Sequence, residues 1–321
     1  MDEFEVISKI FAPLAGGGAF DLKDDAAVIP ARPGFDLVVT TDAVAEGTDF
    51  FAFDPAASVA QKALRVNLSD LAAKGATPCY YLLNLALPAS ITMEWLSAFA
   101  SGLAADQATY GISLLGGDTA RTEGPLSISV TAFGLVPEGR MIRRAGARTG
   151  DDVYVTGTIG DSGGGLAIFR RETHALDEAQ RDALIARYRV PQPPIAFGAN
   201  YLGNFAAAAI DVSDGLIADL GHLARSSGVQ IRIDADSIPR SDALRAFWDD
   251  DDDAVIRAAT AGDDYQIAFT AAPSARETVS NAANECSIPV TRIGSVGPGE
   301  GVQLQRQGRI LPVSRPGYRH F

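Results

Sequence analysis

Residues 54–75 carry the stretch that decides the fold, DPAASVAQKALRVNLSDLAAKG. Asp54 and Pro55 supply a helix cap and a proline suited to the first helical position, and Gly75 ends the helix. The apolar side chains of the core stripe follow helical spacing: Leu64, Leu68 and Leu71. Polar side chains share the adjoining face: Asn67, Asp70 and Lys74. The segment therefore predicts a buried helix with a polar edge.

Apolar strands flank this helix on both sides. We expect strands over residues 37–41, 80–87, 112–115 and 126–136, and a second helix over residues 91–110. The expected order in the first half of the chain is therefore β-α-β-α-β-β.

A composition change separates this half from the next. Residues 137–150 are rich in Gly, Pro and Arg, so we expect two α/β domains, residues 1–137 and residues 138–321. In the second domain we expect strands over residues 153–155, 229–233 and 266–270, a glycine-rich turn over 160–165, and a strand followed by a helix over 209–226.

Composition excludes several classes of protein. The 321 residues carry a formal net charge of −13, which repels nucleic-acid phosphate and means that an anionic ligand needs a local divalent cation. No apolar run reaches the ~18 residues of a membrane span, and the first ten residues are acidic where a signal peptide is basic, so we expect a cytoplasmic protein. Cys79 and Cys286 are expected as buried, reduced thiols. Three scattered histidines make a zinc site implausible.

Aspartates recur where an apolar strand meets a glycine turn or a helix start. Six segments share this feature: residues 24–28, 38–42, 66–75, 114–121, 210–216 and 261–265. Alone, each aspartate is typical of a cap or a turn, and Asp214 is suited to cap the helix that follows it. Together they offer hard oxygen ligands without His or Cys, a donor set that suits Mg²⁺ completed by water and substrate phosphate. We therefore predict a Mg²⁺- and ATP-dependent phosphate-transfer enzyme.

Other features narrow this prediction. Glycines at 116, 117, 163, 164 and 165 are candidates to let backbone N–H groups approach phosphate oxygens. The pattern G-x-x-x-x-G-K-[ST] is absent, which excludes a P-loop enzyme, and the absence of G-x-G-x-x-G counts against a Rossmann dehydrogenase. The run from Asp249 to Asp253 is expected to form a solvated loop.

Several blocks identify a resemblance to a known family. They are residues 67–73 (NLSDLAA), 116–119 (GGDT), 150–151 (GD), 155–157 (VTG), 160–162 (GDS), 211–216 (DVSDGL) and 317–321 (GYRHF). In order and spacing, over nearly the whole chain, they resemble the thiamine-monophosphate kinase family, within the superfamily of aminoimidazole ribonucleotide synthetase and selenophosphate synthetase. The resemblance implies an α/β fold of two domains like that of aminoimidazole ribonucleotide synthetase, with an N-terminal ATP- and Mg²⁺-binding domain that dimerises through its sheet, a C-terminal α/β domain, and a cleft between them.

The resemblance also implies roles for single residues. It assigns several Mg²⁺ ions to Asp25, Thr40, Thr41, Asp42, Asp70, Asp118, Asp211 and Asp214. It assigns ATP to Gly117, Asp118, Arg144 and Ser213, and thiamine phosphate to Asp49, Asp263 and Tyr318. Arg144 can bind phosphate with two hydrogen bonds, and Tyr318 offers a flat surface for a ring, although a terminal aromatic can also simply pack.

The implied reaction is direct in-line transfer of the γ-phosphate of ATP to thiamine monophosphate, giving thiamine diphosphate and ADP, as the last step of thiamine diphosphate biosynthesis. The acceptor oxygen is already ionised, so we expect metal-assisted transfer without a catalytic acid or base. The implied protein is a cytoplasmic homodimer with no nucleic-acid or membrane partner.

Three departures from the family pattern bear on the site. Leu22 and Lys23 precede Asp24 and Asp25 where the family has Gly-x-Gly-Asp-Asp, and the acids Asp49 and Asp263 stand where the family often has His and commonly has Glu. Two alternatives stay open. One is a sibling ATP-dependent synthetase, which would need a reactive N-terminal Cys or Lys that the sequence does not show, and the other is a non-catalytic nucleotide- or metal-binding scaffold.

Overall fold

The structure is a computed structural model that describes residues 3–172 and 176–318. The chain divides into two compact units, one of Met1–Leu71 and Ala76–Gly139 and the other of Ala72–Gly75 and Arg140–Phe321. The division into functional domains of residues 1–137 and 138–321 remains a prediction. Among the described residues, no helix is both long and apolar enough to cross a membrane.

The first unit is built on a four-stranded sheet in the order β1-β4-β2-β3. Its strands are β1 (Phe35–Ala45), β2 (Thr77–Leu87), β3 (Ser113–Arg121) and β4 (Ser127–Pro137), and its long helices are α2 (Ala56–Ala73) and α3 (Met93–Tyr110). Short helical segments precede the sheet: α1 (Glu3–Val6), η1 (Ile7–Phe11), η2 (Ala12–Leu14) and η3 (Phe20–Leu22). β4 pairs antiparallel with β1 and β2, and β3 pairs parallel with β2. The expected order β-α-β-α-β-β is confirmed for this part of the chain.

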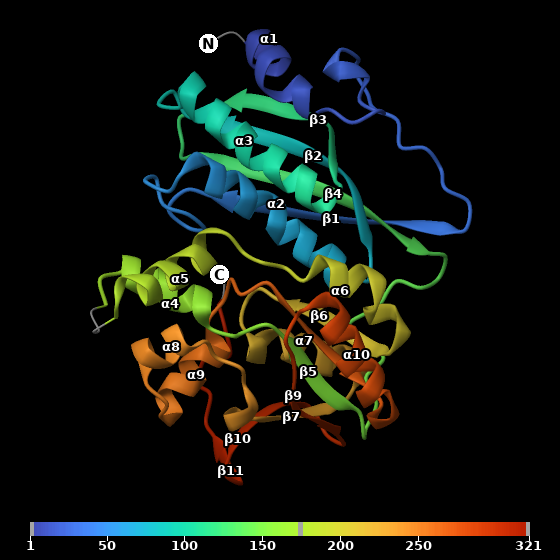
Figure 1. Ribbon diagram of the computed structural model, residues 1–321, viewed down its shortest axis with the longest axis vertical. Coiled ribbons are helices and arrows are strands. Elements are labelled where there is room, and N and C mark those ends of the chain that lie inside the picture. The colour runs from blue at the N-terminus through green and yellow to red at the C-terminus, as the bar shows by residue number, and fades with distance from the viewer. Residues whose placement is uncertain (1–2, 173–175, 319–321) are drawn as a thin grey trace. The chain divides into compact units, whose positions relative to one another are not determined.

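The two long helices lie over the same face of this sheet (Figure 1). The core stripe expected on α2 is confirmed, because Leu64, Leu68 and Leu71 are fully buried. Strand alternation turns every second residue of β1 to the opposite face, where Leu37 and Val39 remain 45% and 59% exposed. One face of the sheet therefore holds the core, and the other presents apolar side chains.

The second unit is built on a seven-stranded sheet in the order β11-β10-β7-β9-β5-β8-β6. Its strands are β5 (Asp152–Thr156), β6 (Ala206–Val212), β7 (Gln230–Asp234), β8 (Gln266–Ala271), β9 (Val290–Gly297), β10 (Gly301–Arg306) and β11 (Arg309–Leu311). Its helices are α4 (Asp161–Phe169), α5 (Glu178–Arg189), α6 (Ile195–Asn200), α7 (Leu216–Ser227), α8 (Asp242–Trp248), α9 (Asp252–Thr260) and α10 (Arg276–Cys286), with short turns η4 (Leu202–Asn204), η5 (Ala235–Ser237) and η6 (Pro273–Ala275).

The glycine-rich turn expected over residues 160–165 is wrong, because Gly163, Gly164 and Gly165 lie inside α4. Their missing side chains let α4 approach its neighbours closely. A methyl group on Gly165 would come within 2.3 Å of the Leu184 carbonyl of α5, and one on Gly164 would come within 2.9 Å of Leu244 on α8. These glycines serve helix packing, so they do not form a loop that cradles phosphate.

The acidic run from Asp249 to Asp253 is only partly a loop. Asp251 caps α9 by accepting the N–H of Ala254, and Asp252 pairs with Arg306. The arginines that meet this run were not visible from its local sequence.

Cys79 and Cys286 are free, as expected, but they are half-buried and not fully enclosed. Burial raises the pKa of both thiols.

Candidate functional site

Two carboxylates and a hydroxyl meet between β1 and α2 in the first unit. Strand alternation places Thr40 and Asp42 on the face that α2 covers, and helical spacing presents Asp70 to them. The Thr40 hydroxyl donates to Asp70 Oδ2 at 2.5 Å. Desolvation, the charge of Asp70 and a hydrogen bond between the two carboxyl groups raise the pKa of Asp42 to about 6, although other atoms of Asp42 are exposed. Two acids forced together in this way favour a bound cation.

The other predicted Mg²⁺ ligands of this unit are Thr41, Asp118 and Asp25. Among the described residues, their hydrogen bonds go to other partners than Thr40, Asp42 and Asp70. Thr41 points to the opposite face of β1, where its hydroxyl donates to the Val130 carbonyl at 3.1 Å. Asp118 is exposed on β3 opposite Asn84 and accepts the N–H of Thr119. Asp25 is exposed in the segment before β1, where its N–H donates to Asp24.

Gly117 occupies a position that no other residue could fill. Its φ is 155°, and a methyl group there would lie 1.7 Å from the carbonyl oxygen of Leu83 on the neighbouring strand. A glycine is therefore required at position 117 by the close contact between β3 and β2.

Asp49 is held in a turn that the sequence did not reveal. Its carboxylate accepts the N–H of Ala45 at 2.8 Å, and its carbonyl accepts the Lys62 ammonium group at 2.7 Å. Lys62 is only 1% exposed. A lysine amid the apolar residues of α2 is the signal that could have predicted a buried partner for its ammonium group.

In the second unit, one buried carboxylate organises the loop between β6 and α7. Asp219, 3% exposed, accepts the N–H groups of Ser213, Asp214 and Gly215 on the same oxygen at 3.0, 3.0 and 3.1 Å. The expected capping role of Asp214 is therefore wrong: Gly215 is the cap residue, and Asp219 satisfies the N–H groups that precede the helix. Burial outweighs these bonds and raises the pKa of Asp219 to about 7.

Segments predicted to bind different substrates converge on this loop. The N–H of Asp263 donates to the Ser213 carbonyl at 2.7 Å, and the N–H of Tyr318 donates to the Asp214 carbonyl at 2.9 Å. Asp263 has a φ of 69°, in the left-handed region that few residues adopt. Tyr318 is 47% exposed, so it does not serve as a buried packing anchor. The terminal residues 319–321 of the GYRHF block lie outside the described residues.

Arg144 and Asp214 lie within electrostatic reach of His222 on α7. Burial, with the charges of Arg225 and Arg144, lowers the pKa of His222, and Asp214 opposes that effect. The exposed Arg144 side chain is thus near the loop that carries Ser213. Asp211 is 5% exposed at the end of β6, three residues before Asp214.

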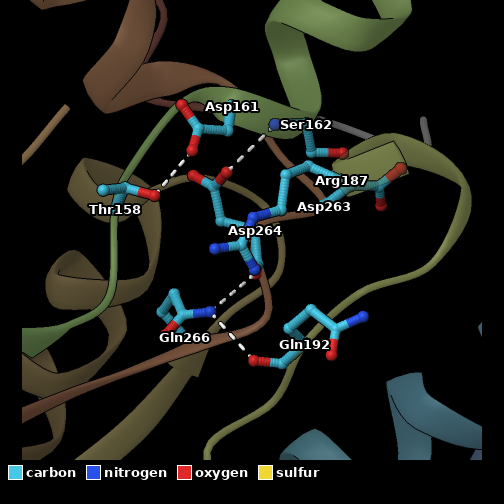
Figure 2. Close-up of a pocket in the computed structure, with 8 residues that line it drawn as sticks. All are labelled: Thr158, Asp161, Ser162, Arg187, Gln192, Asp263, Asp264 and Gln266. Atoms are coloured by element: carbon cyan, nitrogen blue, oxygen red, sulfur yellow. Dashed lines mark hydrogen bonds between the residues drawn. The ribbon is translucent and has the colours of Figure 1, made fainter. Parts of the chain in front are cut away.

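A polar hollow opens beside Asp263 at the first turn of α4 (Figure 2). Asp264 closes one side of it, accepting the N–H of Gly160 at 2.7 Å and, at a longer 3.4 Å, that of Ser162. Burial raises the pKa of Asp264 well above its ordinary value.

The described residues contain no group of three or more His, Cys, Asp or Glu side chains arranged to hold a metal ion by themselves. What the structure does offer is paired carboxylates with hydroxyl and backbone oxygens. Mg²⁺ usually takes only one or two carboxylates and fills its shell with water and substrate phosphate, so this donor set fits it.

Two family models together match most of the chain. The N-terminal domain of AIR synthase related protein matches residues 23–136, and the C-terminal domain of AIR synthase related protein matches residues 148–307. The two-domain α/β fold expected from the sequence is thereby confirmed.

Relatives match over nearly the full length. A thiamine-monophosphate kinase of Caulobacter vibrioides is 42% identical over 323 residues, covering 99% of this chain and 90% of the relative. A crystal structure of thiamine-monophosphate kinase from Stenotrophomonas maltophilia K279a is 42% identical with a TM-score of 0.82, covering 90% of this chain and 91% of that one. A solved structure, AaThiL complexed with AMPPCP and TMP, is 31% identical with a TM-score of 0.79, and the match covers 99% of this chain and 94% of that one.

Proposed function

Because the chain belongs to the thiamine-monophosphate kinase family and is therefore a phosphotransferase, we propose that it transfers the γ-phosphate of ATP to thiamine monophosphate. The products are thiamine diphosphate and ADP, and transfer is in line. A relative of the same fold carries the ATP analogue AMPPCP together with TMP, which supports this pair of substrates.

The observation that carries the proposal within this chain is the convergence on the loop after β6. Ser213, assigned to ATP by resemblance, is bonded through its carbonyl to Asp263, assigned to the acceptor, and Asp214 is bonded to Tyr318. A phosphoryl donor and its acceptor must be held within reach of each other, so residues for both are expected on one loop.

Magnesium fits the carboxylates of this chain. We propose that Asp25, Thr40, Thr41, Asp42, Asp70 and Asp118 of the first unit, with Asp211 and Asp214 of the second, hold several Mg²⁺ ions. The raised pKa of Asp42 beside Asp70 supports this, because a cation between the two carboxylates would relieve their repulsion. When bound, Mg²⁺ neutralises charge on the transferring phosphate.

The protein groups then bind and orient. Arg144 donates to ATP phosphate, Ser213 and Gly117 contact the nucleotide, Asp263 and Tyr318 hold the acceptor, and Asp49 faces its thiazolium ring. The acceptor phosphate is already ionised, so none of these side chains has to remove a proton.

We also propose that two copies associate through the sheet of the first unit, in the cytoplasm. Support comes from the uncovered face of β1, where Leu37 and Val39 are 45% and 59% exposed. A second copy would bury these side chains, which a monomer leaves in water.

A coupled assay for ADP tests the proposed function. We expect Mg²⁺-dependent ADP release that requires thiamine monophosphate. ADP release with another acceptor but not with thiamine monophosphate would favour a sibling synthetase, and ATP binding without turnover on any acceptor would favour a scaffold.

A further inference from the structure

The hollow at the first turn of α4 is not used by any residue role assigned above except that of Asp263, which lies on its edge (Figure 2). Arg187 of α5 and Gln192 of the following segment complete it. All its lining residues belong to the second unit. The ligand that the hollow can bind is therefore determined by side chains of the second unit alone.

Much of the lining is already satisfied by internal hydrogen bonds. Asp161 accepts the Thr158 hydroxyl at 2.6 Å on one oxygen and the Ser241 hydroxyl at 2.6 Å on the other. Gln266 accepts from Thr156 at 2.9 Å and donates to the Gln192 carbonyl at 3.2 Å. These groups form a fixed wall and offer few free donors.

Two polar atoms of the hollow remain able to accept. The Ser162 hydroxyl is buried, in a residue only 1% exposed, and has no hydrogen-bond partner among the described residues. Asp264 Oδ1 has only the 3.4 Å contact with the N–H of Ser162, whereas its other oxygen is firmly bonded to Gly160 at 2.7 Å. Buried polar groups are nearly always hydrogen-bonded. The Ser162 hydroxyl can accept as well as donate, so a ligand group that donates would satisfy both this hydroxyl and Asp264 Oδ1.

Charge and size limit what that ligand group can be. Among the lining residues, the two acids Asp161 and Asp263 outnumber the single cation, Arg187, and this balance disfavours phosphate. The described residues hold no acidic cluster suited to a metal ion. The space inside this partly open hollow admits about one water-sized group. A primary amino group has this size and carries two N–H donors.

We propose that the hollow recognises the exocyclic amino group of an aminopyrimidine ring, with Ser162 Oγ and Asp264 Oδ1 as its acceptors, and that this ring is the pyrimidine of the acceptor. The proposal rests on the proposed function. Adenine carries the same chemistry, but Asp263, assigned to the acceptor, lines the hollow, and the ATP residues Arg144 and Gly117 do not.

The test compares substrates that differ only in the amino group. For the acceptor, kcat/KM is measured with thiamine monophosphate and with its analogue bearing an oxo group in place of the pyrimidine amino group. For the nucleotide, ATP is compared with inosine triphosphate. Both preferences are measured for the wild type, for S162A, for S162C, which keeps a side chain of similar size, and for the control S226A, which removes an exposed hydroxyl from α7.

We expect S162A to lower the preference for thiamine monophosphate over its oxo analogue by about 2- to 10-fold, the usual value of one hydrogen bond, through a higher KM for thiamine monophosphate. S162C should lower the acceptor preference as S162A does, and S226A should keep the acceptor preference of the wild type. The preference for ATP over inosine triphosphate should be the same in every variant. An unaltered acceptor preference in both Ser162 variants overturns the proposal and leaves the kinase function standing. A change in the nucleotide preference alone assigns the hollow to adenine and also overturns it. A wild type that does not phosphorylate thiamine monophosphate refutes the proposed function, and the proposal falls with it.

Discussion

Replacing Asp219 with alanine should destabilise the second unit by about 3 kcal/mol. The carboxylate is 3% exposed and accepts three backbone N–H groups, from Ser213, Asp214 and Gly215. A buried N–H without a partner costs roughly 1–3 kcal/mol, and relaxation of the loop toward water recovers part of that sum. D219N keeps one carbonyl oxygen in the same place, so it should cost only about 1 kcal/mol.

The two tryptophans allow this to be measured for each unit. Trp95 lies on α3 and Trp248 on α8, so urea unfolding followed by fluorescence in a W95F background reports on the second unit. D182A, which removes an exposed aspartate from α5, is the matched control. The urea midpoint should fall in the order D182A, D219N, D219A. If D219A shifts it no more than D182A does, Asp219 does not hold the loop, and the convergence of Asp263 and Tyr318 on that loop must have another cause.

Four further predictions concern single side chains. D70N should abolish ADP release at saturating Mg²⁺ and leave the urea midpoint nearly unchanged, since Asp70 lies on the polar edge of α2; near-normal turnover would remove it from the metal site. R144K should raise the KM for ATP more than that for the acceptor, because lysine cannot make the planar two-pronged contact, and an unchanged KM for ATP would make Arg144 structural. D49N should keep the bond from Ala45 yet raise the KM for thiamine monophosphate several-fold with little change for ATP, and tighter acceptor binding would contradict the ring contact. R65M should cost roughly 3–5 kcal/mol in urea unfolding followed at Trp95, because Asp106 is fully buried and bonded twice to Arg65 at 2.8 Å; recovery in the R65M/D106L double variant is expected, and its absence would count against the paired charge as the cause.

Local patterns were enough to predict the four strands and the two long helices of the first unit, but not the short helical segments that precede its sheet. The leucine stripe of α2 and the apolar run of β1 have a period that survives in the fold, so both were expected within a few residues of their observed bounds. The strands β9 to β11 were missed because Gly294 and Gly297 interrupt β9, and β11 spans only Arg309–Leu311.

Site contacts were harder to predict because they join distant segments. Strand alternation could separate Thr40 from Thr41, but nothing in the sequence near Asp49 reveals the Lys62 ammonium group that meets its carbonyl. The role of Asp219 also depends on a loop conformation set by the positive φ of Gly215, which local propensity does not specify. The motif blocks located the residues, whereas their hydrogen-bond partners required the three-dimensional structure.

The glycines of α4 limit which substitutions can raise the thermal stability of this protein. Exchanging a helical glycine for alanine is a standard stabilising substitution, worth up to about 1 kcal/mol from the unfolded chain alone. At Gly165 the added methyl group would meet the Leu184 carbonyl at 2.3 Å, a backbone atom that cannot rotate aside. Substitutions chosen by helix propensity alone would therefore destabilise the protein at this helix. Gly203 has open space around its Cβ position and is a safer site for an alanine.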